Sequence, residues 1–87
     1  MPYLLVRHKV TDFSQWKPTY DNHLSARQKA GLKEVYLLRH IDDPNEVVLL
    51  FEAEDVQRAR DFAASSDLRE TMQRSGVVDR PDAYFLE

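Results

Sequence analysis

The chain has 87 residues, enough for one domain spanning residues 1–87 and not for two. Its formal charge of −3 is spread along the sequence without a basic block, which gives no support for a nucleic-acid or membrane partner. Because cysteine is absent, a disulfide scaffold and a thiolate metal site are excluded. The apolar stretch near the N-terminus is short and meets charged residues at once, so we expect a soluble cytoplasmic protein without a signal peptide or transmembrane span.

The apolar content is high for a chain of this size. A domain this small buries only about 60–65 % of the surface of its unfolded chain, so its own core is marginal. Hydrophobic residues nevertheless make up 43 % of the sequence. This combination predicts a second buried surface, most simply a homodimer interface.

The first predicted element is a strand over residues 3 to 10, YLLVRHKV, which is rich in β-forming residues. Alternation divides it into two faces. One of them is the more apolar and should lie under the helices; it carries Leu4, Val6, His8 and Val10.

A helix is predicted from about residue 12 to residue 30, with Gly31 as its C-terminal cap. Pro18 lies a few residues inside this start and has no N–H to donate. We therefore expect either a separate turn over residues 12 to 16 or a main helix that begins at Pro18. The apolar stripe of the helix consists of Phe13, Trp16, Tyr20, Leu24 and Ala30.

Residues 32 to 54 read as a hairpin of two strands. The second strand covers residues 32 to 41, and DDPN at residues 42 to 45 has the chemistry of a turn. The third strand, residues 46 to 54, is almost continuously apolar, which predicts a central strand with both faces covered.

Two short helices and a last strand complete the pattern. The first helix, residues 55 to 64, should face inward with Val56, Ala59, Phe62 and Ala63. SSD at residues 65 to 67 offers a cap for a second helix that ends at Gly76, and DAYFLE at residues 82 to 87 is the fourth strand.

This order of elements predicts an α+β, ferredoxin-like βαββαβ fold, with a four-stranded antiparallel sheet and its helices on one face. The opposite sheet face contains Leu5 and part of the third strand. It is apolar, and no helix is left to cover it. We therefore expect a homodimer that packs sheet against sheet.

Four stretches carry a resemblance to a known family: RHKVTDFSQWKPTYDNH, AGLK, DDPNEVVLLFEAED and SDLRETMQRSGVVDRPDAYFLE. They span nearly the whole chain and resemble small bacterial proteins of the dimeric α+β barrel superfamily, the antibiotic-biosynthesis-monooxygenase-like and cyclase-like proteins. The resemblance implies a ferredoxin-like subunit that pairs with its twin and has a cavity between sheet and helices.

The same resemblance implies a range of activities: cofactor-free monooxygenation, haem degradation, polyketide cyclisation, or none. Haem-degrading members use a Trp, an Asn and a His, drawn partly from the second half of the domain. The only tryptophan here is Trp16, and residues 55 to 76 contain no Trp, His or Asn. Haem degradation is therefore disfavoured, and we expect no cofactor.

The candidate catalytic residues are His23 and His8. Trp16, Tyr20 and His23 follow one another at offsets of four and three, which places them on one helix face. If His8 lies under that face, either imidazole could be the general base for a phenolic or enolisable substrate, aromatic or polyketide-like, with Trp16 and Tyr20 stacking on it. The alternative is that the aromatics are core, His23 borders solvent and His8 is a hydrogen-bonded buried group.

A second candidate group lies at residues 38 to 40, LRH, which echoes VRH at residues 6 to 8. Arg39 or Arg7 could bind an anionic substrate through its planar guanidinium, and His40 is taken with Arg39 as substrate-binding. The alternative is a set of surface or interface salt bridges. No metal is expected, because the histidines lack helical metal-site spacing and DDPNE lacks the glycine of a calcium loop.

Two functions remain open from the sequence. The first is a small-molecule-pocket protein of the cofactor-free monooxygenase or cyclase type that uses a histidine base on a small aromatic ligand. The second is a non-catalytic homodimeric binding or interaction module in which the same residues form the core.

Overall fold

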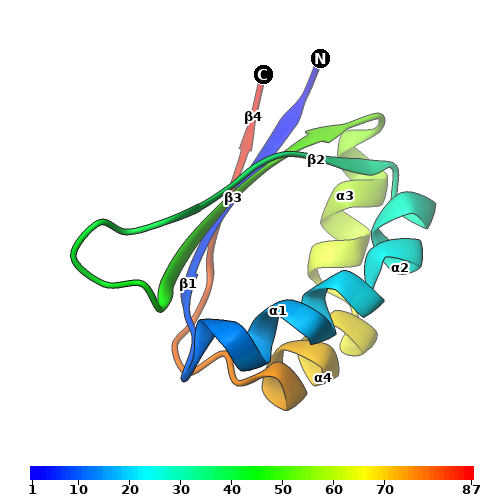
Figure 1. Cartoon of the computed structure of the whole chain (residues 1–87). Coiled ribbons are helices and arrows are strands. Elements are labelled where there is room, and N and C mark those ends of the chain that lie inside the picture. Colours follow the sequence, from blue (N-terminus) through cyan, green and yellow to red (C-terminus); the bar gives the residue numbers. More distant parts are fainter.

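The computed structural model describes residues 1–87. The elements are, in chain order, β1 (Tyr3–Lys9), α1 (Phe13–Asn22), α2 (Leu24–Lys29), β2 (Leu32–Arg39), β3 (Glu46–Ala53), α3 (Val56–Ala63), α4 (Ser66–Ser75) and β4 (Asp82–Leu86). The strands form one antiparallel four-stranded sheet in the order β2-β3-β1-β4. All four helices lie on the same face of this sheet (Figure 1). The predicted ferredoxin-like α+β fold is confirmed, and no helix is long and apolar enough to span a bilayer.

The two central strands, β1 and β3, carry the core. Leu4 and His8 of β1 are buried under the helices, opposite Phe51 and Val47 of β3. The predicted inward face of the first strand is thereby confirmed. Strand β3 is internal as expected, but in a single chain the helices cover only one of its faces, so its alternate residues are half-buried.

The first helix departs from its prediction at two places. Asp12 caps α1 by accepting a hydrogen bond from the Ser14 N–H, and Pro18 lies inside the helix without breaking it. The break comes at His23 instead, between α1 and α2. There the Tyr20 carbonyl accepts hydrogen bonds from the His23 N–H at 3.1 Å and from the Arg27 guanidinium at 2.7 Å, which tightens the chain. The expectation of a turn or a new start at the proline was therefore wrong.

The break at His23 also changes which residues of α2 face inward. Leu24, predicted in the apolar stripe, is 49 % exposed, and the buried positions are Arg27 and Ala30. Gly31 follows with a φ of 75°, as its predicted role as a C-terminal cap requires. The side chain that α2 buries is therefore the charged Arg27 and not the predicted Leu24.

Strand β2 contains a bulge between Glu34 and Tyr36. Directly paired residues share a sheet face, so Glu34, opposite Phe51, lies on the helix side, whereas Tyr36, opposite Leu50, lies on the outer side. The middle of the outer face is apolar and bare, as predicted. Its apolar residues include Leu5, Tyr36, Leu38, Val48, Leu50, Tyr84 and Leu86.

Candidate functional site

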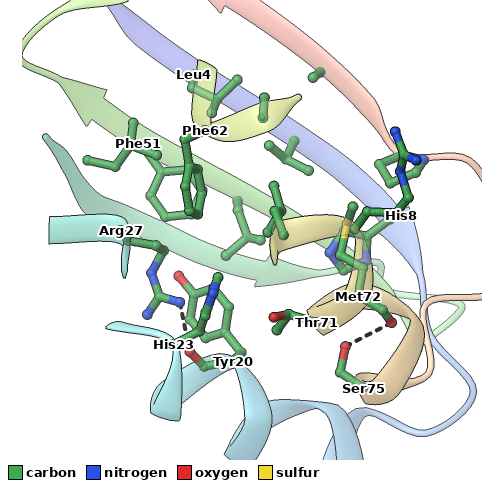
Figure 2. A pocket seen from close by; sticks show the side chains of 18 of the residues that line it. Leu4, His8, Tyr20, His23, Arg27, Phe51, Phe62, Thr71, Met72 and Ser75 are labelled. Carbon is green, nitrogen blue, oxygen red and sulfur yellow. Dashed lines mark hydrogen bonds between the residues drawn. The ribbon is translucent and has the colours of Figure 1, made fainter. Parts of the chain in front are cut away.

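A cavity of about 410 Å³ lies between the helix-side face of the sheet and the helices (Figure 2). This volume is in the range of small-molecule sites in proteins. Most of the lining is apolar, and the walls come from all four strands and all four helices. The apolar lining includes Leu4, Leu49, Phe51, Phe62, Leu68 and Met72.

Trp16 and Tyr20 form one wall of the cavity. Their rings stack with centroids 4.8 Å apart. The His8 and Trp16 rings meet in a T-shaped arrangement with centroids 5.5 Å apart. Both aromatics are also buried members of the core, Trp16 at 3 % exposure and Tyr20 at 9 %. Core packing and cavity lining are therefore two properties of the same side chains here.

His8 is one of the two imidazoles that line this cavity. It is 3 % exposed, and its Nδ1 has no hydrogen-bond partner in the chain, contrary to the expectation of a hydrogen-bonded buried group. Burial lowers the pKa of His8, although the Asp79 carboxylate partly opposes the effect. The ring is consequently neutral at pH 7.

His23 is the second imidazole, and it has a partner. Its Nε2 lies 2.9 Å from Oδ2 of Asp67, and its ring stacks on Phe62 with centroids 5.8 Å apart. If Nε2 carries the proton, it donates to the carboxylate and Nδ1 is left as the acceptor. An imidazole oriented by a carboxylate is the arrangement found in general bases.

Arg27 enters the same end of the cavity from α2. It is 6 % exposed, donates to the Tyr20 carbonyl, and places its guanidinium carbon 3.7 Å from the centroid of the Tyr20 ring. The Tyr20 hydroxyl donates to Oε1 of Glu34 at 2.7 Å. Burial and this hydrogen bond raise the pKa of Tyr20, so the phenol remains protonated near neutral pH.

The structure brings together His8, Trp16, Tyr20 and His23 of the predicted set. Arg27 and Asp67 were missed. Arg27 continues the offsets of the helix face, four residues after His23, and that spacing was the available signal. Asp67 gave no such signal, because it is 44 residues from His23 in the sequence. It also lies in the first turn of α4, where the helix dipole stabilises an acidic side chain and so explains Asp67 without His23.

Arg39 and His40 do not line the cavity. The Arg39 guanidinium lies 3.9 Å from the centroid of the Phe13 ring and donates to the Pro44 carbonyl. The His40 side chain is exposed, and its Nδ1 accepts a hydrogen bond from the Asp42 N–H.

Arg7 also lies away from the cavity, on the outer face of the sheet. It forms ion pairs with three carboxylates, those of Glu46, Asp79 and Asp82. No group of three or more His, Asp or Glu side chains is placed to hold a metal ion. The chemistry-bearing residues of the cavity are thus its imidazoles, its phenol and its guanidinium groups.

No protein-family model and no curated protein matches the sequence. Solved structures do match. A candidate antibiotic biosynthesis monooxygenase from Bordetella bronchiseptica superposes with a TM-score of 0.79 at 18 % identity, over 99 % of this chain and 94 % of that one. SnoaB, a cofactor-independent oxygenase from Streptomyces nogalater, superposes with a TM-score of 0.69 at 15 % identity, over 95 % and 89 % of the two chains.

A candidate antibiotic biosynthesis monooxygenase from Caulobacter crescentus CB15 gives a TM-score of 0.70 at 13 % identity, over 98 % of this chain and 86 % of that one. At such identities the likeness establishes the fold. The chain therefore has the ferredoxin-like α+β fold of the antibiotic-biosynthesis-monooxygenase-like structures, in agreement with the resemblance of its sequence. Fold alone does not assign a reaction.

Proposed function

We propose that the protein binds an aromatic or polyketide-like molecule in this cavity and acts on it as a cofactor-free monooxygenase or cyclase. The observation that carries the proposal is His23 on the wall of an apolar cavity, paired with Asp67, which lies outside the lining. The stacked Trp16 and Tyr20 rings belong to the same lining and make it suitable for an aromatic ligand. The likeness to SnoaB, a cofactor-independent oxygenase, supports the same class of chemistry.

His23 is the better candidate for the general base. An efficient base has a pKa near the working pH, and burial lowers the pKa of His8 away from it. The Asp67 carboxylate at 2.9 Å stabilises the charged ring that forms when His23 accepts a proton. His8 instead offers a neutral ring nitrogen to a polar group of the ligand.

Both reaction types begin with the same proton transfer. His23 takes a proton from an acidic carbon or a phenol, which leaves an electron-rich anion held between apolar walls that exclude water. In oxygenation of a ring methylene, this anion reduces dioxygen; one oxygen atom becomes the carbonyl oxygen, and the other leaves as water with the two methylene hydrogens. In cyclisation, the anion attacks a carbonyl carbon of the same molecule, and the proton returns to the new alkoxide.

The test uses dihydroxyanthrone, a flat phenolic molecule with an acidic methylene group. Exchange of its methylene protons with heavy water under nitrogen measures proton transfer alone, and dioxygen uptake in air measures oxygenation. We expect the native protein to accelerate exchange. In His23→Gln the exchange rate should be about 10²–10⁴-fold lower than in the native protein. Asp67→Asn should lose less, because the base itself remains.

His40→Gln is the matched control, since this histidine is exposed and lies outside the cavity. It should keep the native rate. A native rate in His23→Gln would remove His23 from the role of base. A native protein that binds the probe yet accelerates neither exchange nor uptake would favour the non-catalytic binding module.

We also propose that a second copy of the chain covers the outer face of the sheet. Tyr36, Leu38 and Tyr84 are 58 %, 55 % and 53 % exposed on that face, which suits an isologous sheet-to-sheet contact. Sedimentation equilibrium should give twice the chain mass of 10.2 kDa, and Leu38→Lys should shift it toward one chain. Leu24→Lys, on an exposed leucine away from this face, is the control. A single-chain mass for the native protein would overturn the dimer.

A further inference from the structure

We infer that the cavity contains an anion subsite at Arg27, and that its ligand is an aromatic carboxylate. The inference rests on the proposal that the cavity binds an aromatic molecule, and it adds the charge of that molecule and the residue that recognises it. The subsite lies at the end of the cavity where Arg27, Tyr20 and His23 gather, whereas His8 lies at the other end (Figure 2).

Arg27 is a buried charged side chain with few partners in the chain. Arg27 is 6 % exposed, and the only hydrogen bond of its side chain is to the Tyr20 carbonyl at 2.7 Å. It forms no ion pair with any carboxylate of the chain, although six other basic side chains do. The nearby Glu34 is hydrogen-bonded to the Tyr20 hydroxyl instead.

A guanidinium in this position cannot resolve its burial by losing a proton, because arginine stays charged in proteins. Glu34 and Asp21 act on this charge only through space, and a buried ion without a direct partner is costly, so an anion that enters the cavity would supply the missing partner. The remaining N–H groups of Arg27 form the planar fork that pairs with a carboxylate through two parallel hydrogen bonds.

The charged side chains of the cavity lining are all positive. Besides Arg27, the charged side chains of the cavity are Arg69 and Arg80, and no Asp or Glu lines it. The chain as a whole has a charge of −3, so this cavity departs in sign from the rest of the molecule. Such a lining attracts anionic ligands and disfavours cationic ones.

The geometry also orients the ligand. With its carboxylate at Arg27, the ring system lies along the Trp16–Tyr20 wall, and the far end reaches toward His8. His8 lines that end, and its Nδ1 is a buried nitrogen without a hydrogen-bond partner in the chain, which a hydroxyl or carbonyl group of the ligand would satisfy. The ligand is therefore a flat acid with a second polar group at its opposite end.

The experiment compares naphthoate with naphthamide, which have nearly the same shape and differ in charge, by isothermal titration calorimetry. We expect the native protein to bind naphthoate at least about tenfold more tightly, as a hydrogen bond to a charged group would give. Arg27→Met should bind both ligands alike. Arg39→Gln, an arginine that lies outside the cavity, should keep the native preference.

Each of the other possible outcomes would overturn one part of the proposal. Equal native affinities would remove the anion subsite and leave an aromatic cavity, whereas failure of both ligands to bind would remove the cavity ligand as well. A preference that survives Arg27→Met but is lost in Arg69→Gln or Arg80→Gln would move the anion to the rim. If Arg27→Met does not fold, Arg27→Lys keeps the charge without the fork and should retain only part of the preference.

Discussion

The two ends of the cavity hold two buried polar side chains that meet the same physical problem with different results. His8 is 3 % exposed and Arg27 is 6 % exposed, and burial lowers the pKa of both. The histidine starts from 6.5 and becomes neutral at pH 7, whereas the arginine starts from 12.5 and keeps its charge. Desolvation thus removes the charge of one side chain and leaves the charge of the other.

Trp16 joins the two ends, and its removal has the largest expected effect. Its ring contacts His8 on one side and stacks on Tyr20 on the other, within the buried core. Trp16→Ala should lower the free energy of unfolding by about 3–5 kcal/mol, as large-to-small core changes do. Urea denaturation measures it, with Leu24→Ala as an exposed control expected to change by less than about 0.5 kcal/mol. A loss below roughly 1 kcal/mol would mean that Trp16 borders open space instead of packing.

Acid should act on the His8 end with an intermediate effect. Because its pKa is lower in the folded chain than the ordinary 6.5, the unfolded chain binds an additional proton below that pH. This contribution to stability is complete above pH 6.5 and is lost as the pH falls below it, by at most about 1.4 kcal/mol per pH unit. Of the charged neighbours, Asp79 opposes the shift and Arg7 reinforces it.

Denaturation at about pH 7.5 and about pH 5.5 measures this loss, which should be greater in the native protein than in His8→Gln, by at most about 1.4 kcal/mol. His40→Gln provides the control, because its histidine is exposed and should leave the native loss in place. If the native protein and His8→Gln lose the same stability in acid, the His8 ring takes up its proton as easily in the folded chain as in the unfolded one.

Substitution at the Arg27 end should have the smallest effect on stability. Exchange of a buried charged side chain for an apolar one of similar size is often neutral or stabilising, so Arg27→Met should raise the free energy of unfolding by about 0–1 kcal/mol. The Tyr20 carbonyl keeps its hydrogen bond from the His23 N–H. Urea denaturation decides the matter: a loss of about 2 kcal/mol or more would assign Arg27 to the support of the helix break.

Local signals were sufficient for the fold and for its helix ends. Gly31 and Gly76 were predicted as caps, and both have positive φ angles. The position of the break in the first helical region was missed, since Pro18 costs only one helical hydrogen bond and the tightening at His23 depends on where the Arg27 side chain reaches. A period of apolar residues contains no information about that contact.

The site was predicted in part for a similar reason. Trp16, Tyr20 and His23 share a spacing, so sequence alone placed them on one face. Arg27 has the same spacing, but a charged residue on an amphipathic helix is normally assigned to solvent. The His23–Asp67 pair joins two distant helices, and the position of Arg39 over Phe13 follows a bulge in β2; neither arises from a local rule.

The place of Trp16 has an optical consequence. It is the only tryptophan of the chain, and its indole lies against the His8 ring, the Tyr20 ring and the cavity at once. Its fluorescence therefore comes from a single, defined position between the neutral His8 ring and the charged Arg27 end. An aromatic ligand that absorbs near the indole emission would quench this signal, and protonation of His8 would alter it. The molecule thus contains its own reporter of occupancy, without any label.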